Sequence, residues 1–147
     1  MKSFRGEKYY LSNMFPCTVR INWKGKIYTM KSSESAFQAL RSPEHINEYV
    51  PLNGFEAKKL SKSHTCRADW SDVSIDIMTY VLRCKFTQNL DLAAKLKALE
   101  GEIVEYNEWY DTFWGVCNGV GENHLGKCLM TIRDELLKSN STNTVSM

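Results

Sequence analysis

The chain is organised around residues 105–126, which read EYNEWYDTFWGVCNGVGENHLG. Aromatic residues at positions 109, 110, 113 and 114 crowd around one acid, Asp111. Three glycines follow, at positions 115, 119 and 121, and they interrupt any regular element and let a ligand approach the backbone closely. Aromatic rings, a carboxylate and a glycine loop are typical of a small-molecule pocket. The same residues also suit a packed turn that Asp111 caps, and the pattern alone leaves both interpretations open.

The length and charge of the chain predict one domain. It has 147 residues, and 19 basic against 17 acidic side chains give a net charge of +2. A balance this close argues against a strong general nucleic-acid binder. No apolar run approaches the ~18 residues of a membrane span, and the N-terminal region lacks the apolar segment of a signal peptide. We therefore expect a soluble, cytoplasmic protein.

The cysteines and histidines predict neither a disulfide framework nor a metal site. The five cysteines include no Cys-x-x-Cys pair, and the three histidines are dispersed along the chain. We expect reduced, mostly buried thiols, with no metal and no cofactor. A cysteine nucleophile paired with His124 is the alternative.

A short helix that begins near Glu34 carries a polar stripe. A preceding serine can cap this helix, and Pro43 ends it. Glu34, Gln38 and Arg41 fall on one face at helical spacing. Such a stripe is more often a solvated polar face than one wall of a site, and without further information we favour the solvated face.

Periodicity elsewhere predicts a β-hairpin and further helices. Alternating apolar residues at 18–30, around a central glycine, indicate the hairpin. Helical patterns and one short strand follow, the helices at about 56–62, 72–88, 90–99 and 122–138 and the strand at 103–106. The order of segments predicts a compact, mainly helical α+β domain with a small β-hairpin sheet over 1–138. Residues 139–147 are expected to be a flexible C-terminal tail.

Six short motifs, taken in order and spacing, resemble the NADAR superfamily, which is named for its association with NAD and ADP-ribose. They are YLSNMFPC at 10–17, SESAFQA at 33–39, DW at 69–70, KF at 85–86, DTFWG at 111–115 and GENHLG at 121–126. The resemblance extends over roughly residues 4–137. The chain departs from the usual family pattern at Met14, Ser35 and Arg41.

The resemblance implies a hydrolase of N-glycosyl compounds, an N-glycosidase. Cleavage of a ribosyl–nitrogen bond needs an acid for the leaving nitrogen, and a base for water or a nucleophile. Glu34 and Asp111 are the two carboxylates in the motifs, and a pair in different environments can divide these roles. Lys85 is the lysine that the resemblance implies for attack on the sugar through a Schiff base. The alternative for Lys85 is a lysine at a helix end that extends to solvent.

The other predicted site residues are aromatic, amide or glycine positions of the same motifs. They are Asn13, Phe15, Gln38, Trp70, Trp114, Gly115, Gly121 and Asn123. The rings are expected to stack on a base or flank the sugar. The amide side chains are expected to hydrogen-bond ribose hydroxyls or phosphate oxygens. The loop at 119–123 opens the last helix, and free amides there would suit a phosphate.

Three substrates fit the implied activity: a phosphoribosylamino-pyrimidine of riboflavin synthesis, ADP-ribosylated guanine, or a free NAD-derived nucleotide. The basic segment 58–67 would add weak nucleic-acid contacts in the guanine case, although a solvated basic face is more frequent. The alternative function is a module that binds ADP-ribose or a related nucleotide without turnover. No membrane partner is expected.

Overall fold

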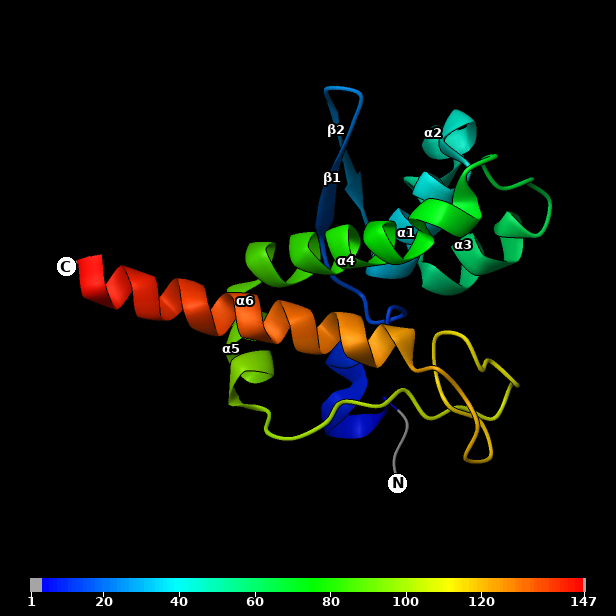
Figure 1. Ribbon diagram of the computed structural model, residues 1–147. Helices are drawn as coiled ribbons and strands as arrows, with labels where there is room; N and C mark the ends of the chain where they lie inside the picture. Colours follow the sequence, from blue (N-terminus) through cyan, green and yellow to red (C-terminus); the bar gives the residue numbers. More distant parts are fainter. Residues whose placement is uncertain (1–3, 147) are drawn as a thin grey trace.

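Two long helices lie side by side in the computed structural model of the protein (Figure 1). They are α4 (Trp70–Gln88) and α6 (His124–Ser146). The structure describes residues 4–146. Apolar side chains of both helices, including Met78 and Leu129, are buried in the main core. The apolar seam that the spacing of leucines predicts for the last helix is therefore confirmed.

The predicted β-hairpin is present and consists of β1 (Val19–Trp23) and β2 (Lys26–Met30), paired antiparallel along their full length. Lys24 and Gly25 form the turn with φ values of 52° and 84°. Positive φ at both central residues is typical of the tight turn that matches the twist of two strands. Ile21 is buried, and α4 and the short helix α1 (Ser33–Arg41) pack against this strand.

The remaining elements are short and surround this frame. They are η1 (Gly6–Leu11), α1 (Ser33–Arg41), η2 (Pro43–His45), α2 (Ile46–Tyr49), α3 (Gly54–Ser61) and α5 (Leu90–Ala98). α1 begins where a serine cap predicts it, because the Ser32 side chain accepts a hydrogen bond from the Ser35 amide. α3 begins with a capping box between Asn53 and Glu56. The turns η1, η2 and α2 follow no periodic pattern in the sequence.

The strand predicted at 103–106 is wrong, because this segment forms only an isolated bridge between Tyr106 and Val116. The Val116 amide donates to the Glu105 carbonyl at 2.8 Å, and the Asn107 amide donates to the Val116 carbonyl at 2.9 Å. These two bonds tie the 105–107 segment to the glycine-rich loop, and they leave no room for a longer ladder.

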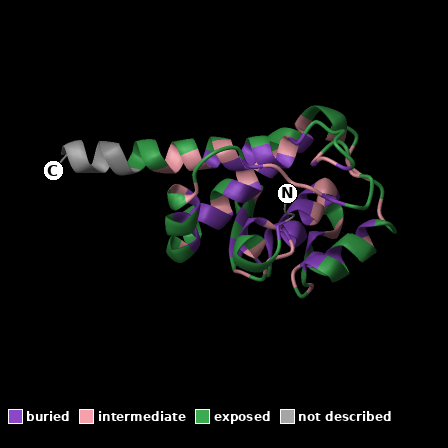
Figure 2. Cartoon of the chain, turned by 90° about the horizontal axis from the view of Figure 1, so that it is seen from below, coloured by how far each residue is buried: buried purple, intermediate pink, exposed green. Residues whose placement is uncertain are grey.

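α6 continues past Lys138, where the apolar pattern predicts its end, and runs to Ser146. The side chains from Leu137 to Ser139 are exposed, beyond the part of α6 that packs on the core (Figure 2). The flexibility of the 139–147 tail stays a prediction, and Met147 lies outside the described residues. The predicted class, a mainly helical domain with one small hairpin, is confirmed.

Membrane insertion through a helix finds no support in the described part of the chain. No helix within residues 4–146 is both long and apolar enough to cross a bilayer.

Candidate active site

A cavity of about 350 Å³ lies where α1, α3, the N-terminal segment and the 105–114 loop meet. Five of the predicted site residues line it: Asn13, Glu34, Gln38, Asp111 and Trp114. They come from three segments that are far apart in the sequence. The cavity thus brings these motifs together, and their role as a functional site stays a prediction.

Glu34 contributes a buried carboxylate from the first turn of α1. Only 8% of the residue is exposed, so the expectation of a solvated polar face is wrong at this position. Its amide donates to the Asn13 carbonyl at 3.0 Å, which joins the start of α1 to the N-terminal segment. Burial raises the pKa of the Glu34 carboxyl; the Gln38 hydrogen bond and Lys58 oppose this rise, and the charge of Asp111 adds to it.

Gln38 lies one turn after Glu34 and presents an unsatisfied acceptor. Its Nε2 donates to Glu34 Oε2 at 2.7 Å. Its Oε1 is the one buried side-chain oxygen or nitrogen of the described residues that has no hydrogen-bond partner. Since buried polar atoms nearly always have partners, this oxygen suits an N–H or O–H group of a ligand.

Arg41, the third member of the predicted stripe, turns away from the cavity. Its Nη1 donates to the carbonyls of Ser61 and His64, at 3.2 and 3.1 Å. The stripe is therefore divided. Glu34 and Gln38 line the cavity, whereas Arg41 hydrogen-bonds to the end of α3 and the loop that follows it.

Asp111 has both of the roles that its sequence context allows. Its Oδ1 accepts hydrogen bonds from the amides of Phe113 and Trp114, at 3.1 and 2.9 Å, so it caps a turn. It also lines the cavity together with Trp114. Of the other aromatic residues, Trp109 also lines the cavity and is 51% exposed, whereas Tyr110 is 81% exposed and does not line it.

Glu105 is a lining residue that the sequence analysis missed. Burial raises the pKa of its carboxyl to about 7, with a contribution from Asp111, while the Asn107 hydrogen bond and Lys58 oppose the rise. The Asn107 Nδ2 donates to Glu105 Oε2 at 3.0 Å. No local signal in the sequence marks this residue, because the apolar pair at 103–104 before it predicts a strand.

Gly115 and Gly121 lie behind the cavity wall and serve close packing. A Cβ atom at Gly115 would overlap Glu105 Oε2 and the Glu105 carbonyl. A Cβ atom at Gly121 would overlap the Gly115 carbonyl, and its φ of 156° also disfavours other residues. Both glycines therefore allow the loop to fold onto the 105 segment.

Lys85 is completely buried but does not line the cavity. Its Nζ donates to the Ser12 carbonyl at 3.0 Å and lies 5.8 Å from the centre of the Phe15 ring. Burial lowers the pKa of Lys85 to about 8. The alternative of a helix-end lysine that extends to solvent is therefore wrong, and the structure places Lys85 behind the Ser12 backbone.

Phe15 and Trp70 also lie outside the cavity lining. The Phe15 ring packs edge-on against Tyr9, with ring centres 5.3 Å apart. The Trp70 ring packs at 5.1 Å on Phe37, which does line the cavity. Trp70 thus supports the cavity wall through Phe37, whereas Phe15 packs on Tyr9, which does not line the cavity.

The expectation of free amides in the loop that opens α6 is wrong for residues 122–125. The amides of residues 122–125 donate to carbonyls of residues 112–115, at distances of 2.7 to 3.4 Å. The Asn123 side chain is equally occupied, since its Oδ1 accepts from the Glu105 amide and its Nδ2 donates to the Ile103 carbonyl, both at 2.9 Å. The amides thus hold the 112–115 backbone, and the Asn123 side chain holds the 103–105 segment.

Within the basic segment 58–67, only Lys58 lines the cavity. Its Nζ lies 5.8 Å from the centre of the Trp109 ring. Arg67 forms a two-pronged ion pair with Asp69, with N–O distances of 2.6 and 3.1 Å. The segment is therefore not one continuous basic surface.

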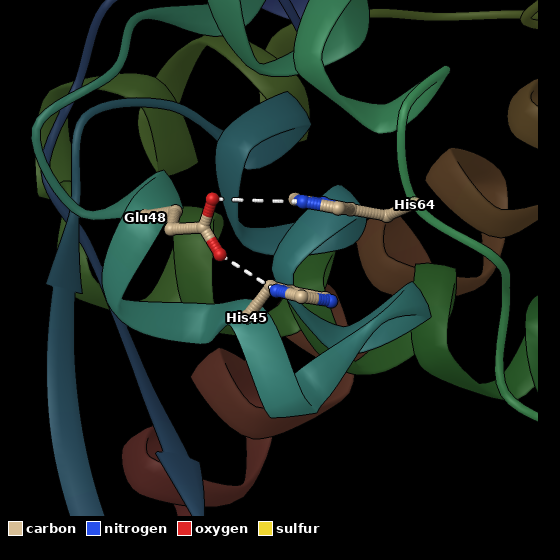
Figure 3. Close-up of side chains that lie close together, drawn as sticks. All are labelled: His45, Glu48 and His64. Atoms are coloured by element: carbon tan, nitrogen blue, oxygen red, sulfur yellow. Dashed lines mark hydrogen bonds and ion pairs between the residues drawn. The ribbon is translucent and has the colours of Figure 1, made fainter.

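Two of the dispersed histidines meet in space, as Figure 3 shows for His45, Glu48 and His64. The imidazole rings stack with centres 3.8 Å apart and planes within 1° of parallel. Glu48 bridges them, with its oxygens 2.6 Å from His45 Nδ1 and 3.6 Å from His64 Nε2. A metal ion binds in the plane of an imidazole, and no single ion can lie in both of these parallel planes. In this arrangement the group is an imidazole stack bridged by a carboxylate.

Comparison with known proteins places the chain in a family. The model of the NADAR domain matches residues 2–137. The NMR structure of the Escherichia coli protein YbiA is similar with a TM-score of 0.80 and 28% sequence identity, over 95% of this chain and 84% of that chain.

Curated relatives extend the comparison. A riboflavin biosynthesis protein of Vibrio vulnificus is 32% identical over 133 residues, which are 86% of this chain and 35% of that protein. The N-glycosidase YbiA of Shigella boydii is 38% identical over 78 residues, which are 52% of this chain and 48% of that protein. The chain thus spans about a third of the first relative and about half of the second. By its family match over nearly the whole length, the chain belongs to the NADAR domain family.

Proposed function

We propose that this chain is an N-glycosidase that hydrolyses a ribosyl–nitrogen bond in a nucleotide-type compound. The observation that carries the proposal is that Glu34 and Asp111, which are far apart in the sequence, line one cavity beside Trp114. Relatives named as N-glycosidases support the reaction type.

The cavity offers the groups that this reaction needs. As the bond breaks, its electron pair goes to the leaving nitrogen and positive charge develops at the sugar carbon and ring oxygen. Glu34 and Asp111 supply negative charge that stabilises this state, and one of them accepts the proton of the attacking water. Gln38 Oε1 is an acceptor for a sugar hydroxyl or a base N–H.

Water attack is the mechanism that we propose in preference to the Schiff base. Lys85 Nζ donates to the Ser12 carbonyl, and Ser12 itself lines the cavity. A Schiff base on Lys85 would require the Ser12 backbone to move aside. In the proposed mechanism Lys85 is a positioning residue that holds this backbone in place.

The substrate that we propose is a phosphoribosylamino-pyrimidine, and ADP-ribosylated guanine is the second candidate. Relatives named riboflavin biosynthesis proteins favour the pyrimidine. Lys58 and Arg5 provide cationic groups at the cavity for a phosphate. A nucleic-acid substrate has less support, because Arg67 in the basic segment is already paired with Asp69.

Glu34→Gln tests the function. The purified protein is incubated separately with the phosphoribosylamino-pyrimidine and with ADP-ribosylated guanosine, and the released base is measured by chromatography. We expect kcat to fall by ~10²–10⁴-fold in Glu34→Gln with substrate affinity largely retained. The control variant is Glu108→Gln, an exposed carboxylate of the 105–114 loop outside the cavity.

Three outcomes test the role of Glu34, the enzyme against the binding module, and water attack against the Schiff base. An unchanged rate in Glu34→Gln would refute the assignment of this residue. Tight binding of ADP-ribose without turnover of either substrate would favour a binding module over an enzyme. Trapping of the sugar on Lys85 by borohydride would favour the Schiff-base mechanism over direct attack by water.

A further inference from the structure

Glu105 brings a third carboxyl group to the cavity, and the roles proposed for Glu34 and Asp111 leave it without one. Glu105 is not a freely moving acid on the surface, because hydrogen bonds hold its backbone. Its amide donates to Asn123 Oδ1 at 2.9 Å, and its carbonyl accepts from the Val116 amide at 2.8 Å. The backbone of Glu105 is therefore fixed from both sides.

The side chain of Glu105 is fixed as well. Asn107 Nδ2 donates to Glu105 Oε2 at 3.0 Å. The absence of a side chain at Gly115 makes room for the same oxygen, because a Cβ atom there would overlap it. One carboxylate oxygen is thus held against the loop by a donor and by close packing.

Asn107 also sets the position of Asp111 relative to Glu105. It is buried, with 6% of the residue exposed. Its Nδ2 donates to the Asp111 carbonyl at 2.8 Å, and its Oδ1 accepts from the Asp111 amide at 3.1 Å. A single amide side chain therefore holds two acid residues of the cavity in a fixed arrangement, which is what shared chemistry on one substrate requires.

The charged groups around Glu105 have opposite effects on the pKa of its carboxyl group. Asp111 on the same loop disfavours a further negative charge, whereas Lys58 on α3 favours it. Glu34 on α1 and Arg5 near the N-terminus also line the cavity. Burial is the largest influence, and the pKa of Glu105 rises to about 7. Near neutral pH a substantial fraction of the protein therefore carries a proton on this residue.

We infer that Glu105 is the proton donor of the proposed N-glycosidase reaction, an assignment that rests on the proposed function. As the carbon–nitrogen bond breaks, its electron pair goes to the leaving nitrogen and the Glu105 proton passes to that nitrogen. Water then forms the new carbon–oxygen bond and loses a proton to Glu34 or Asp111. Glu34 or Asp111 then releases its proton to solvent, and a proton taken up from solvent restores the Glu105 carboxyl group.

The experiment measures kcat/KM from pH 5.5 to 9 for the wild type and Glu105→Gln. The substrate is the one of the two candidates that the wild type hydrolyses. We expect the wild-type rate to fall about tenfold per pH unit above pH ~7, as the donor loses its proton. Glu105→Gln should be ~10²–10⁴-fold slower and should lack this fall. Glu102→Gln, an exposed acid of the same segment outside the cavity, is the matched control.

A second measurement does not depend on activity. The carboxyl carbons of labelled glutamate are titrated by NMR, and the resonance that disappears in Glu105→Gln is assigned to Glu105. We expect its midpoint near pH 7, and a midpoint near 4 would overturn the inference. In Gly115→Ala the added Cβ displaces the carboxylate, so both this midpoint and the alkaline limb of the rate profile should shift.

The outcomes distinguish this inference from the proposed function. If the wild type hydrolyses a substrate but Glu105→Gln keeps its rate and its alkaline limb, the inference is wrong and the function stands. If the wild type hydrolyses neither substrate, the proposed function fails and the inference fails with it.

Discussion

Replacement of Lys85 by methionine removes an ammonium group that the fold buries completely. The wild-type Nζ has one hydrogen bond, to the Ser12 carbonyl at 3.0 Å, and it faces the rings of Phe15 and Phe86. Burial in these surroundings lowers the pKa of Lys85 from 10.5 to about 8. Because the folded protein binds this proton less tightly than the unfolded chain does, stability must depend on pH.

The direction and size of this dependence follow from the pKa. Between about pH 8 and pH 10.5 the unfolded chain carries more protons on Lys85 than the folded protein does, so the stability of the wild type rises with pH in this window. At about 1.36 kcal/mol per pKa unit, the full rise is ~3 kcal/mol. Lys85→Met has no titrating group here, so its stability should not show this rise. At pH 7 it should be at least as stable as the wild type, because the lost hydrogen bond is offset by the removal of a buried charge.

The assay is urea unfolding at pH 7.5, 9 and 10, followed by tryptophan fluorescence. The control is Lys127→Met, which removes an exposed lysine from α6. Groups that titrate in all three proteins, such as the tyrosines, cancel when the proteins are compared at each pH. Cys17 is the titratable neighbour that interacts with Lys85, so the comparison is repeated in a Cys17→Ser background. Parallel stability curves for wild type and Lys85→Met would refute the reasoning, since they would mean that the ammonium group reaches solvent.

Two further substitutions are expected to change the free energy of unfolding by different amounts, both measured by urea denaturation at pH 7. Asn123→Ala removes one buried and one partly buried hydrogen bond and leaves alanine at a φ of 57°, so we expect a loss of ~2–4 kcal/mol. A loss below ~1 kcal/mol would contradict the role of this amide. Arg83→Ala breaks an ion pair with Glu135 whose side chains are 46% and 41% exposed, so the loss should stay below ~1 kcal/mol and shrink in high salt. A larger loss that salt does not change would contradict this estimate.

The elements with local signals could be predicted from the sequence. The hairpin turn follows from Gly25 beside Lys24, and the limits of α1 follow from the serine cap and Pro43. These signals act over three or four residues, so no other part of the fold is needed to interpret them. The apolar faces of α4 and α6 could be predicted for the same reason, because periodicity is a local property of a helix.

The parts that could not be predicted depend on what a distant segment does. Glu34 and Arg41 lie on one stripe of α1, but the loop after α3 covers one end of the stripe and the cavity lies at the other. The start of α6 has the sequence of an anion site, and its amides are occupied because the 112–115 backbone crosses directly above them. Neither the division of the α1 stripe nor the occupied amides of α6 can be predicted from residues within one helical turn.

Glu105 is a candidate functional residue that could not be predicted for the same reason. Its neighbours in sequence, Ile103 and Val104, predict a strand, in which a glutamate would simply point to solvent. Its environment comes instead from Asn107, Asp111 and the backbone at Gly115, which are brought together by the fold of the loop. The pKa of this carboxyl is therefore a property of the loop conformation and not of the local sequence.

The balance of charge in the cavity connects the proposed substrate with the proposed proton donor. Three carboxyl groups, those of Glu34, Glu105 and Asp111, line the cavity against two cationic groups, Lys58 and Arg5. A phosphate-bearing substrate would add further negative charge, and the repulsion on its entry is smaller when one carboxyl group is neutral. Glu105, with a pKa of about 7, can be neutral at physiological pH and still release its proton. The proton that reduces the repulsion when the substrate binds is then the same proton that the leaving nitrogen requires.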